Sequence, residues 1–138
     1  MLEENQVTVS KLVEMFEAAY MEVANVEATT FAVKGVEFPF LINIRVDAER
    51  KKIRFTDYSR LHRITLENAA ILCNEATKGL AFARFYAVEI QEAIMATCQY
   101  EMSFEKGVIP FQIISNFRLF ERVAGSAVQD IFKNHLQP

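Results

Sequence analysis

The chain has 138 residues and a mass of 15.8 kDa, which is the usual size of one domain. Its 51% hydrophobic and 24% charged residues are typical of an ordered globular protein and exclude a linker or a low-complexity tail. The formal net charge of −3 creates no strong field of either sign, which argues against general binding to nucleic acid or to anionic membranes. We expect a single domain over residues 1–138.

The sequence lacks the signals of export and of membrane insertion. Its first residues are acidic and do not form the basic and apolar regions of an export signal. No apolar run approaches the ~18 residues needed to cross a bilayer. The cysteines, Cys73 and Cys98, are too few for a disulfide framework and stand among apolar residues. These features predict a cytoplasmic protein in a reducing compartment.

Apolar residues at steps of three and four predict a first helix over residues 10–23. Thr8 or Ser10 can accept a hydrogen bond from an orphan backbone N–H and cap the start of this helix. Glutamates and a lysine occupy much of its opposite side, which indicates that one face is buried and the other is solvated.

From about residue 28 to residue 58 the period of the apolar residues changes to two, which predicts three antiparallel strands. The first covers residues 29–33 and the second covers residues 38–46. A charged connection then leads into a third strand, in which Ile53 and Phe55 resume the alternation.

Capping signals predict a helix over residues 66–78, with Thr65 at its start and Gly79 just beyond its end. Two further strands are predicted over residues 82–90 and 93–104, joined by a short turn.

Pro110 fits the first turn of a long C-terminal helix, whose apolar stripe reaches Ile131. The order is therefore helix, three strands, helix, two strands, helix. This order predicts an α+β fold with an antiparallel five-stranded sheet, not a parallel array of alternating strands and helices.

No catalytic or metal-binding constellation is found in the sequence. His62 and His135 are isolated, and Cys73 and Cys98 do not have the close spacing that zinc ligands need. The glycines do not form a phosphate-binding loop. We therefore expect no enzymatic activity, no cofactor and no metal, although an enzyme with an unrecognised site stays an alternative.

One basic cluster stands out, and two interpretations of it are open. A charged hairpin keeps a sheet edge soluble and unpaired, which is the interpretation that we favour. The alternative is a site for nucleic acid or for an acidic partner, against which we note that only Tyr58 among the nearby aromatic residues is expected to face outward. The residues of this basic patch are Arg45, Arg50, Lys51, Lys52 and Arg54.

The second face of the predicted sheet has more apolar content than a solvated face normally has. The middle helix, a second subunit or an apolar ligand segment can cover such a face, and we favour the middle helix together with a homodimer contact. The residues expected on this face are Leu41, Thr56, Tyr58, Phe85 and Met95.

A motif pattern over residues 68–131 resembles the YbjN family, which is described as bacterial sensory transduction regulators with a fold like that of type III secretion chaperones. It consists of an asparagine in the middle helix, a short motif that opens the next strand, a Gly-Val pair before the last helix and two phenylalanines within that helix. The residues are Asn74, Ala83-Arg84-Phe85-Tyr86, Gly107-Val108, Phe117 and Phe120. The resemblance implies a regulatory or chaperone-like role in stress or signalling, without enzymatic activity.

The resemblance also singles out Asn74 and Arg84, because polar residues in an apolar helix and an apolar strand need partners when they are buried. They either fix how the middle helix packs on the sheet or belong to a recognition surface. We expect a non-enzymatic module that acts as a homodimer and binds a protein or peptide partner. Its expected interaction surface comprises Leu41, Tyr58, Asn74, Arg84, Phe85 and Met95.

Overall fold

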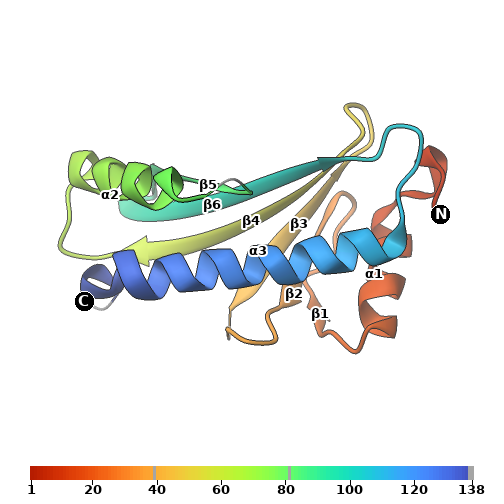
Figure 1. Cartoon of the computed structure of the whole chain (residues 1–138), viewed down its shortest axis with the longest axis horizontal. Coiled ribbons are helices and arrows are strands. Elements are labelled where there is room, and N and C mark those ends of the chain that lie inside the picture. The colour runs from red at the N-terminus through yellow and green to blue at the C-terminus, as the bar shows by residue number, and fades with distance from the viewer. Residues whose placement is uncertain (39, 81, 137–138) are drawn as a thin grey trace.

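The computed structural model describes residues 1–38, 40–80 and 82–136. It contains one six-stranded antiparallel sheet and three α-helices (Figure 1). Short 3₁₀ turns lie near both ends, at Glu4–Gln6 and Lys133–His135. The other elements in chain order are α1 (Val9–Ala18), β1 (Val23–Ala24), β2 (Thr30–Lys34), β3 (Leu41–Asp47), β4 (Lys52–Leu61), α2 (Leu66–Lys78), β5 (Arg84–Ile90), β6 (Ala93–Ser103) and α3 (Pro110–Ile131).

The strands lie in the order β1-β2-β3-β4-β6-β5. The prediction of an α+β antiparallel fold is confirmed, but the prediction of five strands is wrong. The sixth strand is β1, whose Val23 and Ala24 pair with Val33 and Ala32 of β2. Its two residues are too short for an alternation to be visible, and the predicted first helix had included Val23. That helix ends at Ala18, just before Tyr20 takes a left-handed backbone conformation with φ 63°.

The predicted second strand begins too early, because Phe38 and Phe40 precede β3 instead of belonging to it. The two rings stack on each other with their centroids 5.9 Å apart. The two phenylalanines are two residues apart, as in a strand, but they belong to the loop before β3. The predicted bounds of the middle helix and the start of the long helix at Pro110 are confirmed.

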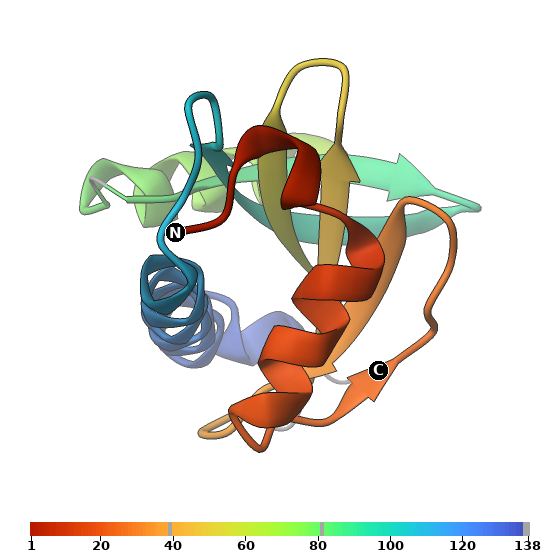
Figure 2. The ribbon, with the colours of Figure 1, turned by 90° about the vertical axis from the view of Figure 1, so that its right-hand side faces the viewer.

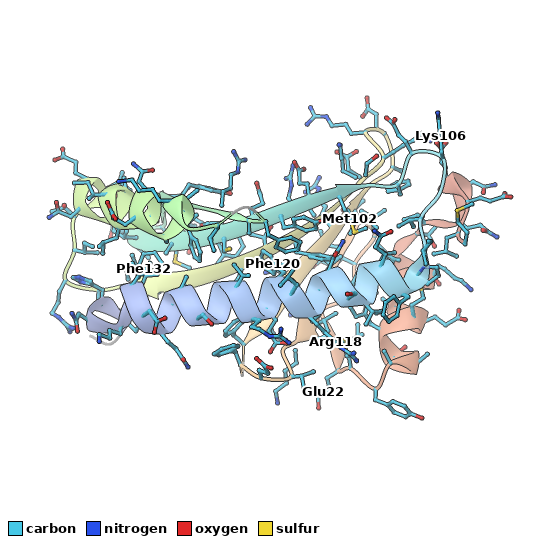
Figure 3. The ribbon with its side chains drawn as sticks, in the orientation of Figure 1. Glu22, Met102, Lys106, Arg118, Phe120 and Phe132 are labelled. Carbon is cyan, nitrogen blue, oxygen red and sulfur yellow. The ribbon has the colours of Figure 1, made fainter. Side chains whose placement is uncertain are left out.

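The core lies between one face of the curled sheet and the helices α1 and α3 (Figure 2). Phe117 of α3 meets Phe16 of α1 and Phe55 of β4 edge to face, with ring centroids 5.2 and 5.8 Å apart. Phe120 of α3 and Phe132, the residue directly after this helix, are also fully buried on this side of the sheet (Figure 3). We call this side of the sheet the core face.

Helix α2 lies beside the edge of β5 that faces away from β6 (Figure 1). The prediction that the middle helix covers the second face of the sheet is therefore wrong. The hydroxyl of Thr77 accepts a hydrogen bond from the backbone N–H of Phe85 at 2.8 Å and lies 3.2 Å from the carbonyl oxygen of the same residue. An unpaired strand edge is prone to association, so its cover by a helix is a stabilising arrangement. Among the described residues, no helix is both long and apolar enough to span a bilayer.

Candidate functional site

The two histidines contact each other at the C-terminal end of the described chain. The backbone N–H of His62 donates to the carbonyl of His135 at 2.7 Å, and Nδ1 of His135 lies 3.0 Å from the carbonyl of His62. The two histidines therefore hold the C-terminal turn against the end of β4. Among residues 1–38, 40–80 and 82–136, no group of His, Cys, Asp or Glu side chains has the geometry to hold a metal ion.

Asp57 is a buried carboxyl on the core face that the sequence analysis missed. It pairs with Cys98 across β4 and β6 and is only 2% exposed, and its Oδ2 has no hydrogen-bond partner among the described atoms. Burial raises the pKa of Asp57 to about 7. Burial also raises the pKa of Cys98, and it raises the pKa of Cys73 to about 11, so both thiols are poor nucleophiles at neutral pH. The signal in the sequence was the position of Asp57, two residues after Phe55 on the buried alternation.

The edge of β6 over residues 100–103 is a candidate binding site, because β5 stops short of it. The pairing of β5 with β6 begins at Arg84, opposite Gln99. On the other side of β6, the N–H of Phe104 donates to the backbone carbonyl of Lys51 at 2.9 Å. Because the direction of the backbone groups alternates along an antiparallel strand, those of the even-numbered residues of β6 face β4. The N–H and C=O groups of Glu101 and Ser103 consequently face away from β4. No backbone partner for them is found within the described part of the chain.

Two hollows flank this free edge. One has a volume of about 460 Å³ and extends from Leu80, two residues after the end of α2, to Glu101, with Phe82 and Tyr100 in its lining. The rings of Phe82 and Tyr100 stack with their centroids 4.1 Å apart. The other hollow, of about 510 Å³, also contains Tyr100 and Glu101 and reaches α3 at Asn116. The amide of Asn116 donates to the Tyr100 hydroxyl at 3.1 Å and fixes the ring between the two hollows.

The second surface of interest is the face of the sheet opposite the core face, which we call the outer face. Within the described residues, no helix lies over it (Figure 2). A hollow of about 310 Å³ lies on this face, lined among others by Arg45, Arg54, Tyr58 and Tyr86. The sequence analysis named Tyr86 only as part of the family motif and did not assign it to this face, because it placed the neighbouring Phe85 there instead.

The predicted basic patch is divided by the structure. Arg45, Lys52 and Arg54 project from the outer face, whereas Arg50 and Lys51 lie at the turn between β3 and β4. The ammonium of Lys51 pairs with Glu4 at 3.0 Å. The patch therefore consists of a sheet-face part and a hairpin part.

Comparison with solved structures identifies the architecture. The crystal structure of YbjN from E. coli, described as a proposed transcription regulator, superposes on this chain with a TM-score of 0.82. The match covers 100% of both chains at 11% sequence identity. The chain has the YbjN fold. No family model matches the sequence, and no curated protein matches it. The resemblance predicted from the sequence is thus confirmed for the fold, which does not by itself carry a function.

On this YbjN fold, the two polar residues singled out by the resemblance are exposed, not buried. Asn74 lies on the exposed side of α2. Arg84 projects from the outer face, donates to Gln99 at 3.2 Å and lies over the ring of Tyr86, with its guanidinium carbon 5.7 Å from the centroid. The expectation that burial forces them to find partners is therefore not met.

The other residues of the expected interaction surface separate into two groups. Leu41 and Tyr58 are exposed on the outer face of the YbjN fold, and Met95 is half-buried there. The prediction that Phe85 shares this face is wrong, because Phe85 is 4% exposed and packs against Phe132 with ring centroids 5.5 Å apart. Its register opposite Cys98 places it on the core face.

Proposed function

We propose that this chain is a non-enzymatic regulatory protein that binds an extended polypeptide segment along the free edge of β6 at residues 100–103. The observation that carries the proposal is the outward direction of the N–H and C=O groups of Glu101 and Ser103. Alternating donors and acceptors with the repeat of a strand are complementary to the backbone of another extended chain. This recognition mode needs no reactive side chain.

The flanking hollows supply the side-chain component of such recognition. Side chains of an added strand point alternately to the two faces of the sheet, and those on the core side meet the stacked rings of Phe82 and Tyr100. On the outer side they meet Arg84 and Glu101. An extended segment with an apolar residue between polar residues fits this arrangement best.

The regulatory part of the proposal is supported by fold analogy with YbjN and by the resemblance of the sequence motifs to its family. A homodimer, as expected from the sequence, is compatible with the same edge, because two copies of β6 can pair about a two-fold axis. Light scattering over a range of concentrations distinguishes a homodimer from a monomer that binds a different protein. A mass of twice 15.8 kDa makes a second copy the candidate occupant of the edge, whereas a monomer leaves the edge for a different protein.

The proposal is tested with peptides selected from a random library displayed on phage. Ser103→Pro removes an outward N–H without removing a hydrogen bond to β4, and proline is tolerated at such edge positions. Ser103→Ala is the matched control, because it keeps the N–H and removes only the hydroxyl. We expect Ser103→Ala to bind the selected peptides as the wild type does and Ser103→Pro to bind about tenfold more weakly. Equal binding by all three proteins, with unchanged melting curves, would contradict the proposal.

A further inference from the structure

The outer face has a charge opposite to that of the whole chain. Strand alternation and register place six basic side chains on it, namely Lys34, Arg45, Lys52, Arg54, Arg60 and Arg84. The carboxylates on the same strands and the same face are Asp47 and Glu101. In a chain with a formal net charge of −3, six of the 15 basic residues therefore share one face with only two carboxylates from its strands.

Most of these cations are not neutralised by a neighbour. The guanidinium of Arg54 donates through Nε and Nη2 to Glu101, at 3.0 and 2.8 Å. Arg45, Arg60 and Arg84 form no ion pair with a carboxylate in the described part of the chain. An anionic ligand can contact them without first breaking an ion pair.

Two tyrosines stand among these arginines in a fixed register. Tyr58 of β4 and Tyr86 of β5 are both paired with Thr97 of β6, which lies between them. Two strand spacings separate the tyrosines by about 10 Å. Tyr58 is 46% exposed, and the guanidinium of Arg84 already lies over the ring of Tyr86. Aromatic rings and guanidinium planes are the surfaces on which unpaired bases stack.

Polar groups form the floor between the charged and aromatic side chains. Asn43, Thr56 and Gln99 occupy one row across β3, β4 and β6, and all three line the hollow of about 310 Å³. The amides of Asn43 and Gln99 can donate and accept hydrogen bonds at the edges of bases, whereas Thr56 is buried beneath them. A membrane surface would instead require a group of exposed apolar side chains, whereas the exposed Leu41 and Ile90 of this face stand apart, at an end of β3 and at an end of β5.

We propose that the outer face binds single-stranded nucleic acid. In this arrangement Arg45, Arg60 and Arg84 contact phosphates, while Tyr58 and Tyr86 stack on bases. The inference goes beyond the proposed function, since the peptide is held by the backbone edge of β6 and the nucleic acid by side chains of the sheet face; Arg84 borders both surfaces. The overall charge of the chain hides this site because most of the 18 acidic residues lie elsewhere.

The test uses a fluorescein-labelled oligothymidylate and measures its fluorescence anisotropy during titration with the full chain at low salt. We expect saturable binding that weakens steeply as salt rises, and at least about tenfold weaker binding to a duplex of the same length. An acidic polypeptide, polyglutamate, serves as competitor. Displacement of the oligonucleotide by polyglutamate at equal charge concentration would show a site for acidic protein and overturn the proposal, as would the absence of binding at low salt.

Variants separate the two parts of the surface. Arg45→Ala combined with Arg84→Ala is expected to weaken binding about tenfold or more and to reduce the salt dependence. Tyr58→Ala is expected to weaken binding about fivefold or more while leaving the salt dependence unchanged. Arg118→Ala, which removes an exposed arginine of α3 away from the sheet, is the control and is expected to bind as the wild type does (Figure 3). Equal losses in all three variants would overturn the assignment to the outer face.

Discussion

The carboxylate oxygen Oε2 of Glu121 lies 2.8 Å from the backbone nitrogen of Phe38 and accepts its hydrogen bond. The same oxygen accepts the N–H of Glu37 at 2.7 Å. Glu121 is only 2% exposed, so these two amides replace much of the water that would otherwise solvate its oxygen. Through this contact the long helix α3 fixes the loop that leads from β2 into β3.

Replacing Glu121 with alanine is expected to lower the free energy of unfolding by about 3 kcal/mol, because two amides and the loop that carries them lose a charged acceptor. Glu121→Gln keeps an acceptor oxygen and is expected to cost less. Glu17→Ala, on the exposed side of α1, is the control and is expected to change stability by less than about 0.5 kcal/mol. Urea denaturation measures all three. Equal stability of Glu121→Ala and Glu17→Ala would show that the contact is not needed.

Gly125 of α3 lies directly under the ring of Phe38. A Cβ atom at this position would collide with Cδ2 of that ring, so Gly125→Ala is expected to destabilise the fold by about 1–3 kcal/mol. Gly79→Ala is the matched control, since a Cβ atom there would meet nothing within 4 Å, and it is expected to be neutral or slightly stabilising. Thermal melting gives the comparison. Adding Phe38→Ala to Gly125→Ala should make the two effects non-additive, and strict additivity would argue against the contact.

Asp57 makes the stability of the fold depend on pH. Burial raises its pKa from 3.8 to about 7, so the folded state favours the protonated carboxyl. The contribution of Asp57 to stability is therefore complete below pH 3.8 and is lost as the pH rises through about 7. Asp57→Asn cannot ionise and is expected to be more stable than the wild type at pH 8, by about 2–4 kcal/mol.

The measurement for Asp57 is the difference in free energy of unfolding between wild type and Asp57→Asn from pH 4 to pH 8, because the other titrating groups cancel in that difference. A difference that grows with pH and levels off above about 7 agrees with the burial of the carboxyl. A difference that is constant with pH would contradict it.

The hydroxyl of Thr77 joins α2 to the edge of β5 through its contacts with the backbone of Phe85. Thr77→Val keeps the shape of the side chain but leaves the N–H of Phe85 without its acceptor, and it is expected to cost about 1–2 kcal/mol. Thr77→Ser keeps the hydroxyl and should cost less. Amide hydrogen exchange at Phe85 reports the same change locally, and unchanged protection in Thr77→Val would exclude the hydroxyl as the partner.

The sequence predicted best the elements whose ends have local chemical signals. The helix over residues 66–78 is bounded by Thr65, whose hydroxyl accepts the N–H of Asn68, and by Gly79. Strand β1 was missed because its only support is pairing with β2, and the face of Phe85 was wrong because alternation within one strand does not give its register against the next strand.

The candidate sites depend even more on contacts between distant segments. Among the described residues, the edge of β6 at residues 100–103 has no paired strand because β5 begins at Arg84, and no residue of β6 itself encodes where its neighbour starts. The outer face was expected to be covered by the middle helix, but Thr77 directs that helix to the edge of β5 instead. The sequence placed Arg54 in a basic cluster and predicted that Tyr58 faces outward. That both line one hollow with Tyr86 follows only from the strand order.

The proposed function is tested most directly by amide hydrogen exchange, followed by NMR, at Glu101, Met102 and Ser103, with the isotope-labelled chain alone and with a selected peptide. The account predicts that Glu101 and Ser103 exchange at least about tenfold faster than Met102 in the monomeric chain, because only Met102 donates to β4. The peptide should then protect Glu101 and Ser103. Protection of both amides in the peptide-free monomer, or a peptide that protects only other parts of the chain, would contradict the account.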